Sequence, residues 1–383
     1  MAPQPDDFET PLVAAEFEDL PGWDAADAVS ALAAFRKSCE KWVASDVDRP
    51  VTSRASYGGK IADWTPACEA AGGDVATQDA ARAYFEAWFS PLEVAPNADT
   101  SKLTGYFEPE LMARRAPEPG FDAAIPGPPD DLVSVNLGDF DESLGTRRFW
   151  GQVKGGRLRL YPPRADIVDD PARALGFADP GDVFYLQIQG SGRVSFPDGE
   201  TIRAAFAAHN NRPFGSIARY LIDQGEITRS QAGMSGVKAW MAAAGSLRAQ
   251  HAMNQNPRYV WFRAETLDPA LGPKGAQGVP LTPMASMAVD PNFHPYGAPI
   301  FIDTRAPVEP GDWEGAPFQT LVIAQDTGGA ITGVRRGDLF FGWGDEAGGR
   351  ASSMNHEMRM WTLLPKSLAA QIAPQKAEIE AQP

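Results

Sequence analysis

A single aspartate between an apolar run and a glycine turn is the strongest candidate for chemistry in this chain. Leu321 to Ala324 suit a buried strand, and Gly328-Gly329 supplies a sharp turn after it. Asp326 lies between the two, at the predicted lip of a sheet. Apolar neighbours would disfavour its ionised form, so we expect a raised pKa suited to a general acid. These neighbours are Ala330, Ile331, Phe340 and Phe341.

The same residues also fit a purely structural role. An aspartate beside Gly-Gly often accepts hydrogen bonds from backbone amides in a turn, and the local sequence does not separate the two roles. A second acid, Asp338, follows within a strand-like run and is a candidate partner for Asp326.

Several other catalytic patterns are incomplete. His356-Glu357 begins like a zinc helix, but Met360 stands where the second histidine is needed, so no metal site is expected. Ser191 does not fit a nucleophile elbow, because Gln189 and Arg193 occupy the glycine positions. We found no dinucleotide or phosphate-binding loop, and no cofactor is expected.

The triplet Asp326-Thr327-Gly328 matches that of aspartic proteases, which need two carboxylates sharing one proton. The chain has this triplet once, and Gly329 replaces the usual small Ser or Ala. A homodimer could supply the second copy of the triplet, so an aspartic protease is an alternative function.

The charge composition of the chain limits the kinds of partner that it can bind. Fifty Asp and Glu against 34 Lys and Arg give the 383 residues a formal charge of −16, which argues against a general nucleic-acid surface. An acidic ligand would have to meet a local cluster of cations. No apolar run approaches the roughly 18 residues of a membrane span, and Met1 to Asp7 does not resemble a signal peptide. We therefore expect a soluble chain of two domains.

Apolar spacing predicts two helices near the N-terminus. One runs from the N-cap Asp24 to Val43, and the other from the N-cap Thr77 to a point before Pro91. Cys39 and Cys68 allow one disulfide, although Cys39 also suits a buried helix face.

From Lys102 onward strand-like runs alternate with turns, and two short helices are expected at 216–224 and 237–244. The predicted strands lie at 103–108, 132–137, 157–161, 183–189, 192–196, 259–262, 285–289, 299–302, 321–324 and 339–343. Beyond Pro365 we expect a frayed polar tail.

An ordered set of motifs resembles the family of membrane-bound lytic murein transglycosylase A. The resemblance covers Leu103 to Pro365 and preserves the family's order of motifs. The motifs are Thr104-Gly105-Tyr106-Phe107-Glu108-Pro109, Gln187 to Gly192, Asn210 with Arg212, Ser286 to Asp290, Gln325 to Ile331, Gly337 to Gly342 and Gly344 to Gly348.

The resemblance implies a mainly β protein with N-terminal helices. Its catalytic domain would be a double-psi β-barrel formed by residues 1–109 and 246–383, with a smaller β domain inserted at 110–245. The family template implies a groove between the two domains. Named members of the family are lipoproteins of the outer membrane, but no anchor cysteine is visible here, because Cys39 follows Arg36-Lys37-Ser38.

The family cleaves the β-1,4 bond between N-acetylmuramic acid and N-acetylglucosamine of peptidoglycan. Asp326 matches its single catalytic acid. The matching substrate-binding positions are Thr104, Gly105, Tyr106, Gln189, Gly190, Ser191, Asp338 and Asp290. A monomer in the periplasm of a Gram-negative bacterium is expected, with glycan strands and cell-wall synthesis or division proteins as partners.

Two other functions are also consistent with these residues. A hydrolytic glycosidase would use Asp326 as the acid and Asp338, Asp303 or Asp290 as the base. A non-catalytic murein-binding module would keep only the binding surface.

Overall fold

The computed structural model describes residues 10–52, 54–73, 77–95, 100–141 and 148–372. Its internal contacts divide the chain into two compact units. The first unit consists of Met1–Tyr106, Lys274–Gly342 and Ser353–Pro383, and the second of Phe107–Pro273 and Trp343–Ser352. Among the described residues, every helix is too short or too polar to cross a bilayer.

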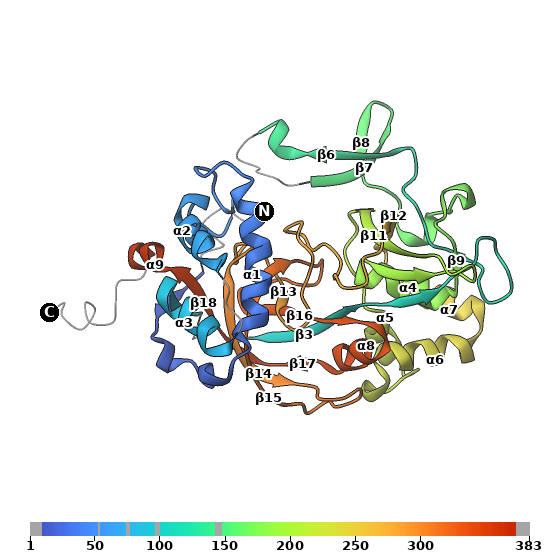
Figure 1. The fold of residues 1–383 in the computed structure, drawn as a ribbon. Coiled ribbons are helices and arrows are strands. Elements are labelled where there is room, and N and C mark those ends of the chain that lie inside the picture. The colour runs from blue at the N-terminus through green and yellow to red at the C-terminus, as the bar shows by residue number, and fades with distance from the viewer. Residues whose placement is uncertain (1–9, 53, 74–76, 96–99, 142–147, 373–383) are drawn as a thin grey trace. The chain divides into compact units, whose positions relative to one another are not determined.

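The first unit is built on a nine-stranded sheet (Figure 1). In spatial order its strands are β1 (Leu12–Ala14), β2 (Phe89–Val94), β18 (Met358–Pro365), β14 (Pro299–Ala306), β15 (Ala316–Asp326), β13 (Ser286–Val289), β16 (Arg336–Trp343), β3 (Lys102–Glu108) and β17 (Asn355–His356). Strands β13 and β15 run parallel, whereas β14 pairs antiparallel with β15 and with β18. No pairing between the end strands β1 and β17 closes the sheet into a barrel over the described part of the chain.

Helices α1 (Ala28–Val43), α2 (Ile61–Ala71) and α3 (Gln78–Trp88) pack against this sheet and share its core. The core is aromatic: Phe35, Trp64, Phe89 and Trp361 are almost completely buried. A disulfide joins Cys39 on α1 to Cys68 on α2, which settles the pairing that the sequence left open. It cross-links two of the helices that cover the sheet.

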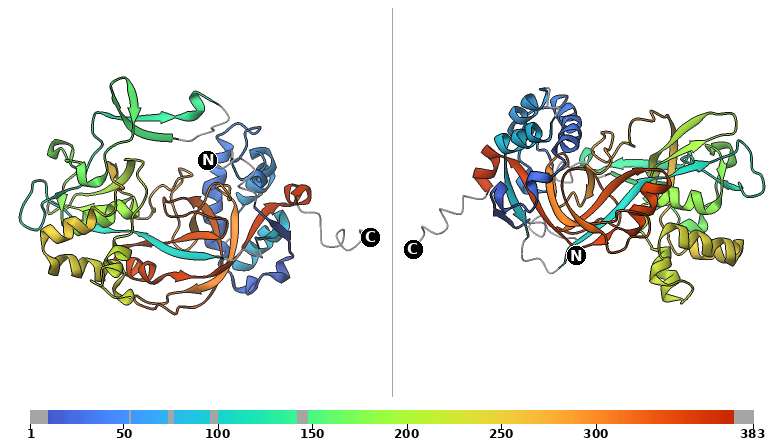
Figure 2. Two further views of the ribbon diagram at one scale, coloured as in Figure 1. Left: turned by 180° about the vertical axis from the view of Figure 1, so that it is seen from behind. Right: turned by 60° about the horizontal axis from the view of Figure 1, so that its bottom comes forward.

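The second unit holds three small sheets and most of the remaining helices (Figures 1 and 2). One sheet has the order β12 (Val260–Thr266), β11 (Thr201–His209), β10 (Gly192–Ser195) and β4 (Glu110–Met112). Another has the order β6 (Leu132–Asn136), β7 (Arg148–Lys154) and β8 (Arg157–Arg159), and β5 (Ala123–Ala124) pairs with β9 (Phe177–Ala178). The helices are α4 (Pro180–Gln189), α5 (Ile217–Asp223), α6 (Met234–Ala244), α7 (Ser246–Met253) and α8 (Gly344–Ser353).

A buried ion cluster stabilises the start of the second unit. The carboxylate of Glu108 is fully buried and accepts hydrogen bonds from Arg193 at 2.9 Å and Arg203 at 2.7 Å. The Arg193 guanidinium also lies 3.9 Å from the centre of the Trp343 ring. Because a buried charge is costly without partners, these residues fix the end of β3 to β10 and β11.

Mainly β content with helices is confirmed, but several predicted elements were wrong. Residues 183–189 form part of helix α4, because Asp179 caps its N-terminus, Pro180 takes the first position and Gly190 ends it in the left-handed region. The first long helix starts at Ala28 with Asp27 as its cap, whereas Asp24 lies in a preceding 3-10 turn.

Further elements were missed or misjudged, among them strands β2, β11 and β18 and helices α7 and α8. Helix α2 was missed because Pro66 lies inside it, yet Ile61, Trp64 and Ala67 bury one face and outweigh that penalty. Strand β7 was not predicted. Residues Lys366–Ile372 of the expected tail form helix α9, and the rest of that tail lies outside the described residues.

Candidate active site

Asp326 is the last residue of β15 and is partly buried. Its Oδ1 accepts a hydrogen bond from the backbone N–H of Ala276 at 2.8 Å. Its Oδ2 accepts the hydroxyl of Tyr106 at 2.9 Å. Both donors are neutral, and each carboxyl oxygen keeps a second acceptor position.

Burial raises the pKa of Asp326 above its usual range, against smaller opposing effects of hydrogen bonds from Thr327, Ala276 and Tyr106. The predicted direction of the shift is therefore confirmed. Ile331 and Phe340 are buried nearby as expected, but Ala330 is exposed and does not contribute to an apolar wall. The Tyr106 ring instead packs against Phe340, with ring centres 5.3 Å apart.

Asp326 follows a β-bulge at Gln325, whose side chain points toward α1. Met287 of β13 pairs with Ala324 and Ala288 pairs with Asp326, so Gln325 is the extra residue. The Gln325 amide donates to the backbone carbonyl of Ala34 and to the hydroxyl of Ser38 on α1. Because successive side chains of a strand alternate, the next residue faces the opposite side.

The loop that donates to Asp326 is itself anchored, and sequence reasoning missed it. The Gln277 backbone N–H donates to the Gln325 carbonyl at 3.0 Å. The Gln277 side-chain oxygen accepts the Ser38 hydroxyl at 2.8 Å. Helix α1 therefore positions the neighbouring Ala276 amide. No motif in the sequence linked residues so far apart.

Asp338 lies on the other side of the same central strand. Ala288 pairs with Asp326 on β15 and with Asp338 on β16. Neighbouring strands are about 4.8 Å apart, so the two aspartates are separated by about 10 Å between Cα atoms, with the small Ala288 between them. The structure thus brings the two predicted acids to one region of the sheet.

The environment of Asp338 differs from that of Asp326. Its Oδ1 accepts the hydroxyl of Thr104, whose oxygen accepts an N–H of Arg336 at 2.8 Å. Burial raises the pKa of Asp338 to about 6; Thr104 and Arg336 oppose this rise, and the charge of Asp326 adds to it.

Strand β3 supplies three of the predicted residues. Thr104 contacts Asp338 and Tyr106 contacts Asp326, with Gly105 between them. Burial and the charge of Asp326 raise the pKa of Tyr106 well above its usual range, so its hydroxyl stays a donor. Tyr296 is a further neighbour that the sequence did not reveal: burial and the charge of Asp326 raise its pKa too.

Asp290 is buried and organises a turn. Its Oδ1 accepts hydrogen bonds from the backbone and side chain of Asn292, and its Oδ2 accepts the backbone N–H of Gly333. With both oxygens engaged by nearby amides, Asp290 holds the loop after β13 to the loop before β16.

Gln189, Gly190 and Ser191 belong to the second unit. Gln189 ends helix α4, and its Oε1 accepts the backbone N–H of Phe107 at 3.2 Å. Gly190 has a φ of 87°, which suits glycine, and Ser191 leads into β10. The three residues form the corner between helix and strand.

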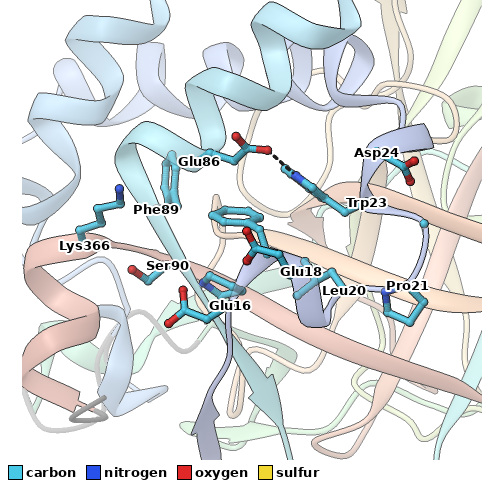
Figure 3. A pocket seen from close by; sticks show the side chains of 13 residues that line it. Glu16, Glu18, Leu20, Pro21, Trp23, Asp24, Glu86, Phe89, Ser90 and Lys366 are labelled. Carbon is cyan, nitrogen blue, oxygen red and sulfur yellow. Dashed lines mark hydrogen bonds between the residues drawn. The ribbon is translucent and has the colours of Figure 1, made fainter. Parts of the chain in front are cut away.

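A separate hollow of about 680 Å³ in the first unit is lined by none of these residues (Figure 3). Four carboxylates line it, from Glu16, Glu18, Asp24 and Glu86. The Trp23 indole N–H donates to Glu86 at 2.7 Å, as Figure 3 shows. Candidate metal-binding clusters were not found among the described residues of the chain.

Two family descriptions match this chain. The MltA specific insert domain matches residues 102–263, and the 3D domain matches residues 285–364. The Escherichia coli K12 protein named membrane-bound lytic murein transglycosylase A is 30% identical over 298 residues, which are 76% of this chain and 72% of the relative. The chain therefore belongs to the membrane-bound lytic murein transglycosylase A family, as the sequence motifs predicted.

Other relatives agree with this membership and with the predicted enzyme class. The Vibrio cholerae protein of the same name is 32% identical over 267 residues, 68% of this chain and 64% of that protein. The matched region thus spans just under two thirds of the Vibrio relative. A crystal structure of a membrane-bound lytic murein transglycosylase from Agrobacterium tumefaciens has a TM-score of 0.80 at 28% identity, covering 94% of this chain and 99% of that one.

Proposed function

We propose that this protein is a peptidoglycan lytic transglycosylase that uses Asp326 first as an acid and then as a base. The bond cleaved is the β-1,4 bond between N-acetylmuramic acid and N-acetylglucosamine. The supporting observation is the state of Asp326: a partly buried carboxyl with a raised pKa and both oxygens held by neutral donors. A protonated carboxyl of this kind can give its proton to a leaving oxygen.

The proposed reaction needs no second carboxylate. Asp326 protonates the bridging oxygen while the bond from that oxygen to C1 of the muramic acid breaks. The C6 hydroxyl of the same sugar attacks C1, and Asp326 takes the proton that this hydroxyl releases. An intramolecular nucleophile has a high effective concentration, so the protein does not have to position a water molecule. The product carries a 1,6-anhydromuramic acid end.

Tyr106 and the Ala276 amide would orient the Asp326 carboxyl during both proton transfers. We propose sugar-binding roles for Thr104, Gly105, Tyr106 and Asp338 beside it, and for Asp290 through the loops that it holds. Gln189, Gly190 and Ser191 are proposed to bind sugars from the second unit. The groove expected between the domains stays a prediction, as do the domain limits at 110 and 245.

The fold of the catalytic domain is proposed to be a double-psi β-barrel. Support comes from the parallel pairing of β13 with β15 beside the antiparallel β14, because parallel neighbours require a crossover connection. We also propose a periplasmic monomer that acts on glycan strands, with cell-wall synthesis or division proteins as further partners.

A hydrolytic glycosidase is the second candidate, and Asp338 is the observation that favours it. Asp303 accepts a hydrogen bond from Gln319 and Asp290 is engaged by amides, whereas Asp338 lies across Ala288 from Asp326. Two carboxylates in one site could protonate the leaving group and activate water.

Product analysis separates these functions. Purified sacculi are digested with the wild-type protein and with Asp326→Asn, and the released muropeptides are analysed by mass spectrometry. The transglycosylase proposal expects 1,6-anhydro ends from the wild type and no products from the variant. Reducing muramic acid ends would support hydrolysis. Sacculus binding without any cleavage by the wild type would support a binding module.

A further inference from the structure

The hairpin formed by β7 and β8 is a small cationic feature on a strongly acidic protein. Lys154 pairs with Arg157 across a Gly155-Gly156 turn, and Gln152 pairs with Arg159. Both turn glycines have positive φ, 60° and 68°, as a tight two-residue hairpin requires. Figure 1 shows β6, β7 and β8 side by side.

Three cations gather on one face at the end of this hairpin. The side chains of Lys154, Arg157 and Arg159 are exposed and follow the alternation of the strands to the same side. None of the three forms a salt bridge with another residue that the structure describes. Like charges placed directly opposite each other destabilise a hairpin. An arrangement of this kind is stabilised when an anion binds between the cations.

The opposite face of the hairpin is apolar and exposed. Val153 pairs with Leu158, and their side chains are 57% and 46% exposed. Phe149 on the same face is 43% exposed. Trp150 points the other way and packs against Phe206 and His209 of β11, which anchors the hairpin to the second unit.

The hairpin also offers a free strand edge. The sheet order is β6, β7, β8, so the outer edge of β8 has no partner strand among the described residues. An unpaired edge can add an extended peptide through its backbone groups. Cations, aliphatic side chains and a free edge together fit a short peptide that bears carboxylates and small apolar groups.

We propose that the β7–β8 hairpin is a docking surface for the peptide stems of peptidoglycan. This inference rests on the proposed function, because peptidoglycan carries stems with free carboxylates and alanine methyl groups. The Arg157 and Arg159 guanidinium groups bind the carboxylates in a forked geometry, and Lys154 adds a third charge. The methyl groups lie against Val153 and Leu158.

The hairpin does not have to lie next to Asp326 in order to assist cleavage, because the polymer carries many stems. Binding one stem keeps the rest of the glycan near the same protein molecule, which raises the effective concentration of cleavable bonds. The net charge of −16 explains why a local cationic surface is needed at all, since an acidic polymer is repelled by the rest of the protein.

The test measures binding and not turnover, so all proteins carry Asp326→Asn. Pull-down is performed with intact sacculi and with bead-tethered glycan strands whose stems have been removed by an amidase, because the sacculus dissolves when its cross-linking stems are removed. The test variant is Lys154→Glu, Arg157→Glu, Arg159→Glu. The control variant reverses three other exposed cations, Arg49→Glu, Arg229→Glu and Lys366→Glu, for the same change in net charge.

We expect the test variant to bind intact sacculi about tenfold more weakly at low salt, with the difference shrinking as salt screens the charges. The control variant should bind like the parent, and removal of the stems should abolish the difference. The neutral variant Lys154→Gln, Arg157→Gln, Arg159→Gln should lose less affinity, and thermal melting checks that each variant is folded.

Equal binding of the parent and both hairpin variants to intact sacculi would overturn the docking proposal. So would equal binding of the parent to intact sacculi and to stem-free glycan strands. Hairpin-dependent binding to phosphatidylglycerol vesicles, with no dependence on stems, would assign the surface to a membrane instead. Absence of 1,6-anhydro products from wild-type protein would contradict the proposed function while leaving a stem-dependent binding result intact.

Discussion

Asp326 and Asp338 flank the same residue of β13, yet their carboxyl groups are held in different ways. Asp326 receives the Ala276 N–H and the Tyr106 O–H, both of them neutral. Asp338 receives the Thr104 hydroxyl, and the cation of Arg336 lies behind that hydroxyl. Burial raises the pKa of both, but cations oppose the rise only at Asp338.

This difference bears on the roles of two chemically identical groups. A carboxyl surrounded by neutral donors can hold a proton and release it to a leaving group. At Asp338 the nearby cation opposes the rise, yet burial still takes the pKa to about 6, so this carboxyl can hold a proton as well. We propose Asp326 as the group that moves protons because it matches the family's catalytic acid and its donors are neutral, and the following variants test that assignment.

Asp326→Asn should produce the largest loss. The amide keeps the shape of the side chain but cannot donate and recover a proton, so turnover should fall by about 10²–10⁴-fold. Binding to sacculi should be unchanged. Turnover within threefold of the wild type would remove Asp326 from the chemistry and shift attention to Asp338.

Asp338→Asn should change stability with pH more than it changes the product. The folded pKa of about 6 lies above the ordinary value of 3.8, so the folded protein favours the protonated group. The wild type loses this stabilisation as the pH rises from about 4 to 6, whereas the variant does not. At pH 7 the variant should be more stable by about 3 kcal/mol, with no gain at pH 4.

Denaturant unfolding at the two pH values checks this expectation. A variant that is destabilised more at pH 7 than at pH 4 would show that Asp338 is held mainly as an ion. Its products should keep 1,6-anhydro ends, because the account gives Asp338 no proton to transfer.

Tyr106→Phe should lower turnover by about tenfold, since one hydrogen bond to a charged group is lost while the ring still packs on Phe340. That hydrogen bond favours the ionised form of Asp326, so its loss should raise the pKa of Asp326 further. The fall in rate at high pH should therefore move to higher pH. A lower rate with an unmoved pH profile would indicate only a packing role for Tyr106.

Gln277→Ala should have the smallest effect, about two- to threefold on turnover, because it loosens the loop that carries the Ala276 amide without removing that donor. Ser38→Ala should have the same kind of effect but a larger one, since its hydroxyl donates to Gln277 and also accepts from Gln325. Ser45→Ala near the end of the same helix is the matched control, because its hydroxyl bonds only to Lys41 within that region. Equal effects of Ser38→Ala and Ser45→Ala would mean that α1 does not position the loop.

Local sequence patterns predicted many of the strands and helices. The apolar runs at 299–302, 321–324 and 339–343 lie within strands of the main sheet, the run at 285–289 covers β13 and one residue before it, and the Thr77 cap begins α3. These features depend on neighbouring residues and are legible in a single sequence. The local pattern marked Asp326 as a candidate acid, and the family motifs added its neighbours on β3, residues that periodicity alone does not mark.

Other features depend on contacts between distant parts of the chain. The bulge at Gln325 coincides with side-chain hydrogen bonds from Gln325 to α1, nearly 300 positions away. Residues 183–189 are mostly apolar and alternate poorly, a pattern that does not separate a buried helix from a buried strand; the caps at Asp179 and Gly190 make the segment a helix. The Gly155-Gly156 pair is typical of a two-residue hairpin turn, so a strand before it could have been predicted from the sequence.

The most direct test of the central claim is digestion of sacculi by the wild-type protein in ¹⁸O-labelled water. If one carboxyl serves as acid and base while the C6 hydroxyl attacks C1, water takes no part in the reaction. The anhydro products should then contain no label. Muramic acid ends that carry ¹⁸O from the first turnovers would contradict the account and identify water as the nucleophile.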